Sequence, residues 1–301
     1  MSDQILIFGC GDTGQRVAQH YLAQQRSVAG VVRSEASRRT LLNAGIESFL
    51  IDLDSPITSV SLPSQDAHIF YMVPPPDRGD SDPRLRNMLT VLEQTGSPAR
   101  ILYISTTGVY GDCEGRWIDE TAPLAPATPR AQRRVAAETA LREWCDAHHV
   151  PWIILRVPAI YGPGRLPLER LRSGMPALEP QACGYTNRIH IDDLAHICIK
   201  VMNDASDNTV YNVSDGNPST FTDYLMLLAE LTSLPKPPLV SMQEAASRID
   251  TGMLEFLRES KRVRNDKLLH DLELTLHHPD ARSGILASLD PKSLNPAAGT
   301  I

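Results

Sequence analysis

The chain has 301 residues, with 36 acidic residues against 29 Lys and Arg, so its formal net charge is −7. This balance argues against a general nucleic-acid or acidic-membrane binder, because both need a surplus of cations to neutralise phosphate. No apolar run approaches the length of a membrane span, and the N-terminus lacks a signal-peptide pattern, so we expect a soluble, cytoplasmic protein with a small-molecule partner. The five cysteines are scattered without metal-ligand spacing, and we expect no metal site.

Short apolar runs alternate with amphipathic segments along the first half of the chain. The predicted strands are residues 5–8, 28–32, 48–51, 69–73, 100–105 and 152–156. The predicted helices are residues 15–25, 34–43, 84–94 and 131–148. Continuously apolar strands that alternate with helices predict a parallel sheet covered on both faces, which is a Rossmann-type, doubly wound α/β fold.

The second half has more proline and glycine and shorter elements. It predicts a helix over 192–202, a strand over 210–213 and a helix over 221–231. We expect a dinucleotide-binding domain over 1–163, to which elements of about 189–214 return. Residues 164–188 and 215–289 then form a smaller mixed α/β substrate lobe, and 290–301 a flexible tail.

A glycine-rich turn follows the first strand and opens the first helix. Residues 9–14 read Gly-Cys-Gly-Asp-Thr-Gly and match the G-x-G-x-x-G pattern. In that pattern Gly9 makes the tight turn, Gly11 lets the backbone approach a pyrophosphate, and Gly14 lets the helix pack closely on the strand. Asp12 and Thr13 complete the turn, and the free N–H groups of the helix end favour phosphate. The turn predicts a dinucleotide site; a glycine turn without a ligand is the alternative.

The end of the second strand bears on which dinucleotide binds. An NAD site usually has Asp or Glu there to hold the ribose 2′-hydroxyl. Here the segment ends in Arg33, and the first carboxylate is Glu35. Because a guanidinium pairs well with a phosphate, Arg33 favours NADP, with NAD as the alternative cofactor and an exposed surface arginine as the alternative role.

Further blocks occur in order along the chain. Residues 101–111 read ILYISTTGVYG, and later blocks lie at 119–126, 155–164, 188–195 and 210–215. Together they resemble the extended short-chain dehydrogenases/reductases, which include NAD(P)-dependent epimerases and dehydratases. The resemblance implies that Asp52 contacts the adenine and that Val73, Pro74 and Pro158 line the cofactor. It also implies a homodimer through the helices at 84–94 and 131–148.

The sequence departs from this family at its catalytic pair. The family carries Tyr-x-x-x-Lys at the start of the helix after the fifth strand, with Glu four residues after the Lys. Aligned on Glu138, the Tyr position is Arg130 and the Lys position is Arg134. Arginine does not deprotonate in proteins, so Arg130 cannot act as the base, whereas Arg134 could still hydrogen-bond the nicotinamide ribose. Keeping the glycine turn while losing this tyrosine is typical of the atypical subgroup.

Other residues are candidates for the substrate side. Thr106 stands where the family has its catalytic Ser or Thr; a hydrogen-bonded strand threonine is the alternative. Tyr110 and Tyr161 are candidate substitute phenols, and Arg165 and Arg188 fall where the family meets a substrate diphosphate. The sequence therefore predicts an NADP-binding oxidoreductase or epimerase for a small polar or nucleotide-linked substrate. A non-catalytic NAD(P)-binding sensor or partner-binding module is the alternative.

Overall fold

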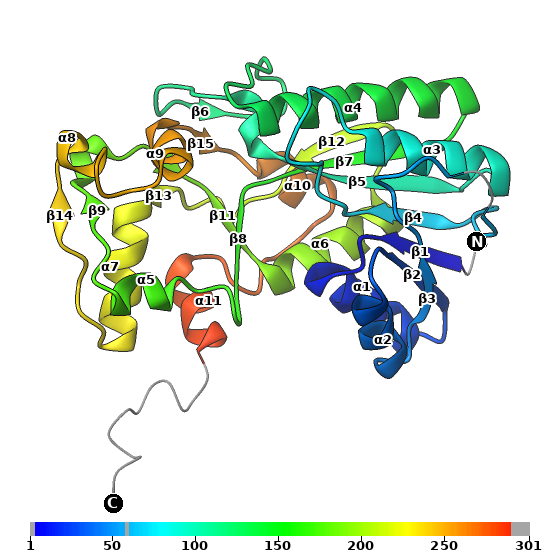
Figure 1. Ribbon diagram of the computed structural model, residues 1–301, viewed down its shortest axis with the longest axis horizontal. Coiled ribbons are helices and arrows are strands. Elements are labelled where there is room, and N and C mark those ends of the chain that lie inside the picture. Colours follow the sequence, from blue (N-terminus) through cyan, green and yellow to red (C-terminus); the bar gives the residue numbers. More distant parts are fainter. Residues whose placement is uncertain (1–3, 58–59, 290–301) are drawn as a thin grey trace, which may run out of the picture.

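The computed structural model describes residues 4–57 and 60–289, and its centre is a parallel seven-stranded sheet (Figure 1). The strand order is β3-β2-β1-β4-β5-β7-β12. The strands are β1 (Gln4–Phe8), β2 (Ser27–Val32), β3 (Glu47–Leu50), β4 (His68–Tyr71), β5 (Arg100–Thr106), β7 (Trp152–Val157) and β12 (Thr209–Asn212). The predicted Rossmann-type, doubly wound fold is confirmed.

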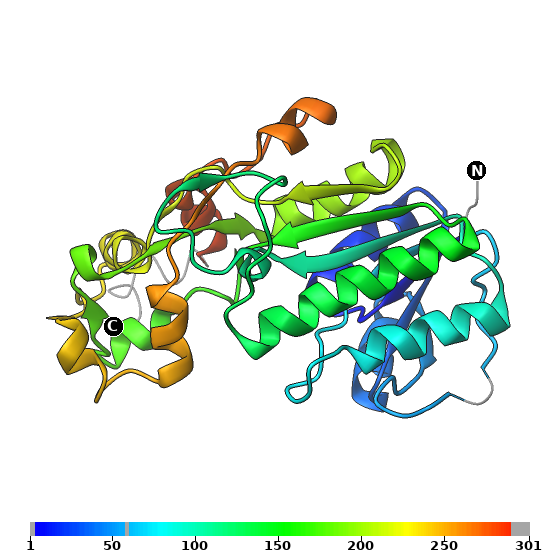
Figure 2. The ribbon, with the colours of Figure 1, turned by 90° about the horizontal axis from the view of Figure 1, so that it is seen from above.

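Helices cover both faces of the sheet, as Figures 1 and 2 show. One face carries α1 (Asp12–Ala23), α2 (Glu35–Asn43) and α6 (Ile191–Asp204), and the other α3 (Pro83–Thr95) and α4 (Pro129–His148). Strand β1 illustrates why both faces are needed. Ile5 and Ile7 pack in the core under α1, α2 and α6, which we call the first core. The alternating Leu6 and Phe8 pack in the second core, under α3 and α4. A strand that is apolar on both sides must be buried on both sides.

The order of the strands creates a crevice beside β1. The chain runs from β1 outward through β2 and β3, then crosses to β4 on the opposite side of β1. The loops that leave β1 and β4 therefore turn away from each other. Such a switch point, at the carboxyl ends of the strands, is where ligands bind in open α/β sheets.

The C-terminal half contributes to this sheet. Helix α6 packs against α1 in the first core, and β12 pairs in parallel with β7 and forms the edge of the sheet. The chain leaves the sheet after Val157 and returns with these two elements.

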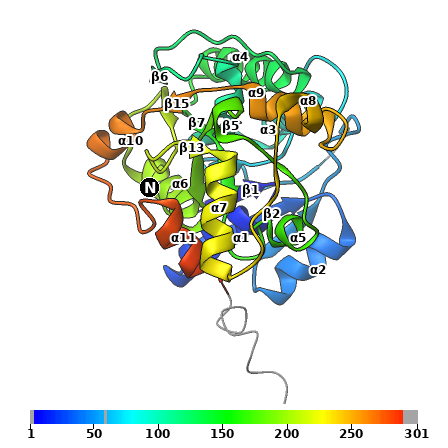
Figure 3. The ribbon, with the colours of Figure 1, turned by 90° about the vertical axis from the view of Figure 1, so that its left-hand side faces the viewer.

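The remaining short elements lie mostly at one end of the sheet, where Figure 3 shows α7 in front of α5 and α11. They are η1 (Thr107–Tyr110), β6 (Trp117–Ile118), β8 (Ala159–Tyr161), α5 (Leu168–Arg172), β9 (Ala177–Leu178), η2 (Pro180–Ala182), β10 (Tyr185–Thr186), β11 (Arg188–His190), β13 (Ser219–Thr220), α7 (Phe221–Thr232), β14 (Leu239–Val240), α8 (Met242–Ala245), α9 (Thr251–Arg258), β15 (Arg262–Val263), α10 (Asp266–Asp271) and α11 (Ala281–Ser288). Two small apolar clusters hold this lobe together, one centred on Leu225 and Ile285 and one on Val240 and Leu257.

Several boundaries differ from the prediction for identifiable reasons. Helix α1 begins at Asp12 rather than at residue 15, because Asp12, Thr13 and Gly14 form its first turn and carry little apolar signal. The two-residue strands of the lobe are too short to show an alternating pattern. The tail expected over 290–301 lies outside the described residues. In the described part of the chain, no helix has the length and apolarity needed to cross a membrane.

Candidate functional site

The glycine turn lies at the switch point, between the ends of β1 and β4. Gly9 has a φ of +76°, and a Cβ on it would meet the backbone nitrogen of Val73 at 2.9 Å, so only glycine fits without strain. A Cβ on Gly14 would lie 3.1 Å from the side chain of Ile7, which is the close helix–strand contact expected of this position. Over Gly11 the space is open, because nothing lies nearer than Gly9 O at 3.9 Å.

The N-terminus of α1 is shaped for an anion. Gly11 is its N-cap and provides no side-chain cap, and the first-turn N–H groups of Asp12 and Thr13 have no partner within the helix. Asp12 lies in this turn and pairs with Arg16 at 3.2 Å and with Arg165 of the smaller lobe at 3.0 Å. The open cradle and the unsatisfied helix end fit the pyrophosphate of a dinucleotide.

Arg33 follows β2 at the next strand end, and its side chain is 65% exposed. Its Nη1 lies 2.9 Å from Asp54 Oδ2, and Arg84 of α3 pairs with the same carboxylate. Hydrogen bonds from Arg84 first, and from Arg33, lower the pKa of Asp54. Asp54 is a carboxylate that the sequence analysis did not connect with Arg33. Asp52 follows β3 and accepts a hydrogen bond from the backbone of Asp54 at 3.1 Å.

The segment after β4 is held by arginines of α3 and α4. Val73 O accepts a bond from Arg134 Nη1 at 3.4 Å, and Pro74 O accepts one from Arg84 Nη1 at 2.9 Å. Arg134 is buried, and the same Nη1 lies 3.0 Å from both the Tyr103 hydroxyl and Ile104 O. Arg134 is thus tied to β4 and β5 and is absent from the described lining of the main cavity. The expected bond to a nicotinamide ribose stays a prediction.

A cavity of about 750 Å³ opens between the ends of β5 and β7 and the smaller lobe. Thr106 and Pro158 line it from the sheet, Arg130 from the start of α4, and Arg165 from the lobe. The structure therefore brings together four residues that the sequence analysis nominated from separate segments.

Thr106 is the last residue of β5. Its hydroxyl oxygen accepts the N–H of Gly108 at 3.2 Å and so caps η1. The hydroxyl proton has no acceptor within the described residues, so the group can still donate to a ligand in the cavity. Thr106 is therefore both a structural cap and a candidate contact.

Tyr110 differs from the expectation. It is 1% exposed, its hydroxyl donates to Asn212 at 2.8 Å, and it accepts from Arg156 at 2.9 Å. Burial raises its pKa. Arg156 in turn makes two bonds with the buried Glu138, at 2.8 and 3.2 Å. Tyr110 thus belongs to a buried network that joins η1, α4, β7 and β12, and does not line the cavity.

Tyr161 is likewise unsuited to proton transfer near neutral pH. It is 4% exposed, its hydroxyl donates to Asp280 O at 3.2 Å, and burial raises its pKa strongly. It lines a second, mainly apolar cavity of about 290 Å³ within the lobe, together with Arg165 and Arg188. Arg188 is buried there, donates to Ser219 at 2.8 Å and lies over the Tyr224 ring.

Three lining residues were missed by sequence reasoning: Arg133, Tyr185 and Lys261. Lys261 is buried and donates to Gly111 O at 2.7 Å and to Glu259 at 2.6 Å. Helical spacing places both Arg133 and Arg134 near the face of Arg130, so it could have made Arg133 a candidate without choosing it over Arg134. Tyr185 and Lys261 carried no such signal, since the lobe brings them in from distant segments.

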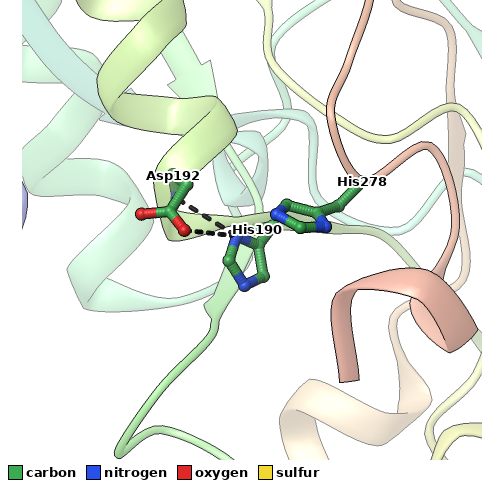
Figure 4. A group of neighbouring side chains, drawn as sticks. All are labelled: His190, Asp192 and His278. Carbon is green, nitrogen blue, oxygen red and sulfur yellow. Dashed lines mark hydrogen bonds and ion pairs between the residues drawn. The ribbon is translucent and has the colours of Figure 1, made fainter. Parts of the chain in front are cut away.

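Figure 4 shows a group of neighbouring side chains, His190, Asp192 and His278, that lie close enough to share a metal ion. His190 Nδ1 accepts the N–H of Asp192 at 3.2 Å, and Nε2 lies 3.0 Å from the Ser288 hydroxyl. That hydroxyl donates to Gly284 O, so Nε2 carries the imidazole proton. Burial, and then His278, lower the pKa of His190. Both nitrogens of His190 are engaged, which makes the group a brace between α6 and α11. The absence of a metal site stays a prediction.

Comparisons with known proteins agree with this geometry. Residues 84–214 match the model of the NAD dependent epimerase/dehydratase family. The protein YeeZ of Escherichia coli K12 is 25% identical over 290 residues, which cover 92% of this chain and 97% of YeeZ.

Solved structures extend the likeness over the whole fold. A functionally unknown conserved protein from Silicibacter pomeroyi is 31% identical with a TM-score of 0.82, over 94% of this chain and 97% of that one. The UDP-glucuronic acid 4-epimerase of Bacillus cereus, solved in complex with NAD, has a TM-score of 0.75 over 95% of each chain. At 17% identity, that second likeness concerns the fold.

Proposed function

Because this chain belongs to the NAD-dependent epimerase/dehydratase family, we propose that it binds NADP at the glycine turn and serves as an oxidoreductase or epimerase. The substrate is a small polar or nucleotide-linked molecule held in the 750 Å³ cavity. The observation that carries the proposal is the open space over Gly11 at an N-terminus of α1 without a side-chain cap. Both features match what a pyrophosphate needs, and neither is needed for packing.

The preference for NADP rests on the charges beyond β2. Arg33 and Arg84 share one carboxylate, that of Asp54, so neither guanidinium holds that carboxylate alone. The exposed guanidinium of Arg33 can exchange Asp54 for a 2′-phosphate, which accepts more hydrogen bonds and carries more charge. The ionised Asp54 carboxylate can also accept a hydrogen bond from a ribose hydroxyl, and in that state it favours the binding of NAD.

The test is to measure dissociation constants of NADP and NAD by calorimetry. We expect wild type to bind NADP more tightly, and Arg33→Gln to weaken NADP binding about tenfold with little effect on NAD. Asp54→Asn should raise the preference for NADP. Arg39→Gln is the matched control, because Arg39 is 75% exposed and pairs only within α2. Tighter binding of NAD by wild type would overturn the assignment of NADP.

The nicotinamide, when bound, provides a hydride donor or acceptor. The chain itself provides the Thr106 hydroxyl, which can donate to a substrate oxygen, and walls from Pro158 and the lobe that limit access of water. Arg130 occupies the position of the family tyrosine and cannot take a proton. Four titratable side chains that line the cavity can carry one: Tyr185, Lys261, Asp77 and Glu259.

A second function, cofactor binding without catalysis, is favoured by one observation. The position where the family has its proton carrier is an arginine, and the two substitute phenols first considered, Tyr110 and Tyr161, are buried and bonded elsewhere. Reduction of NADP followed by its absorbance, together with chromatographic separation of epimeric products from candidate polyols, distinguishes the two functions. A protein that binds NADP tightly and gives no turnover with any anionic or neutral polyol fits the second.

We also infer a homodimer through α3 and α4. These helices lie side by side on the outer face of the sheet (Figure 2), and Trp144 of α4 donates to Glu93 of α3 at 2.8 Å. Light scattering of the eluting protein should give twice the mass of one chain, and a monomer at micromolar concentration would contradict this inference.

A further inference from the structure

We propose that the N-terminal end of α4 is a binding site for an anionic group, a carboxylate or a phosphate, held by Arg130 and Arg133. The site lies in the cavity lined by Thr106, so the inference rests on the proposed function for placing a substrate there. It narrows the substrate to an anion, such as a hydroxy acid or a phosphorylated polyol.

The first support is the state of Arg133. This side chain is only 5% exposed, yet it lines the cavity. Its Nη1 donates to Gly79 O at 2.8 Å, while its buried Nε has no hydrogen-bond partner. Within residues 4–57 and 60–289, no carboxylate lies within ion-pair distance of it. A buried guanidinium with no counter-charge is costly, and an anion in the cavity would supply that charge.

The second support is the position of Arg130. It lies three residues before Arg133, so both side chains leave the same face of α4, and both line the cavity. Burial lowers the pKa of Arg130 first, and the neighbouring positive charges of Arg134 and Arg133 lower it further. The end of a twenty-residue helix adds a partial positive charge at the same place. Thr128 and Pro129 fix this helix start, as N-cap and first residue.

The third support is that the other cations of the cavity are already neutralised. Arg165 pairs with Asp12 at 3.0 Å, and Lys261 pairs with Glu259 at 2.6 Å. Arg130 and Arg133 make no ion pair among the described residues. Asp77, which also lines the cavity, is the acidic residue whose charge raises the pKa of Arg130. An anion that enters the cavity is therefore drawn to α4, beside the Thr106 hydroxyl.

The test uses two probes on the full chain, inorganic phosphate and malonate, titrated by calorimetry at low ionic strength with and without saturating NADP. We expect one probe to bind at one site per chain. Arg130→Gln and Arg133→Gln should each weaken it about tenfold or more, and Arg133→Lys should restore part of the loss. Arg172→Gln is the control, since Arg172 is half exposed and pairs with Glu169 within α5. The probe that binds more tightly identifies the group, phosphate or carboxylate.

Each result has a defined meaning. Equal binding by wild type, Arg130→Gln and Arg133→Lys would overturn the proposal, as would an equal loss in Arg172→Gln. Displacement of the probe by NADP would also overturn it, because the anion would then occupy a site of the cofactor. If wild type bound the probe but not NADP, and both glutamine variants lost the probe, the anion site would be supported and the proposed function refuted. Arg130→Gln is informative even if Arg133→Gln does not fold, since Arg130 lies at the surface of the cavity.

Discussion

A single methyl group at Gly11 should separate cofactor binding from folding. Gly11 has a φ of −83°, which alanine adopts readily, and its added Cβ would meet no atom within 3.9 Å. The free energy of unfolding of Gly11→Ala should therefore lie within about 1 kcal/mol of wild type. The same Cβ would fill the space through which a pyrophosphate approaches the turn. Overpacking of this kind costs about 1–3 kcal/mol, so the dissociation constant for NADP should rise about 5- to 150-fold.

The assay pairs calorimetric titration with NADP and urea unfolding of the free protein. Gly9→Ala provides the contrast, because its Cβ would meet the Val73 backbone at 2.9 Å in a left-handed conformation that alanine disfavours. That variant should lose stability as well as affinity. If Gly11→Ala bound NADP as tightly as wild type, the turn would not be the pyrophosphate site and the reasoning from its open space would be refuted.

Two further predictions concern buried carboxyl groups. Burial raises the pKa of Asp215 to about 7, so its folded form holds a proton that the unfolded chain loses near pH 4. The stability that this group contributes is present at low pH and is lost as the pH rises through 7. Relative to Asp215→Asn, the free energy of unfolding of wild type in urea should fall by about 2.5 kcal/mol between pH 5 and pH 8. The same dependence on pH in both proteins would contradict this. Glu138→Gln, which strands the buried Arg156, should cost about 3 kcal/mol by the same method, and a loss below about 1 kcal/mol would argue against the network.

The features that could be predicted from the sequence are those set by local pattern. The central strands of the sheet are mainly apolar runs, and the glycine turn sits between an apolar run and an amphipathic one. Gly9 must be glycine because the backbone of Val73 lies close to it, and Gly14 because the side chain of Ile7 does. The spacing of the glycines in the motif predicts both close contacts.

The parts of the site that could not be predicted depend on pairing between distant segments. Asp54 reaches Arg33 from beyond β3, and Arg165 reaches Asp12 from the smaller lobe. Alignment to the family pattern drew attention to Arg134, whereas the rotation of α4 turns Arg133 toward the cavity and Arg134 onto β5. A difference of one residue on a helix is about 100°, which is enough to exchange a ligand contact for a structural one.

Tyr110 shows a second way in which sequence reasoning falls short. Its place in the motif beside Thr106 made it a candidate phenol. Its hydroxyl is instead hydrogen-bonded to Arg156 and Asn212, which lie on strands distant in sequence. Whether a polar side chain faces a ligand or a buried partner is decided by which groups converge on it, and one-dimensional spacing does not contain that information.

The return of the chain to complete the sheet has a consequence for how the protein is made. Translation must pass Asn212 before β12 can pair with β7, and must pass α6 before the apolar face of α1 is covered. Until then the nascent chain presents an open strand edge together with exposed Val17 and Tyr21. We therefore expect a fragment that ends at residue 163 to aggregate, because it lacks both covering elements. Residues up to Asn212, including the lobe segment 164–188, must be synthesised before both elements can cover the sheet.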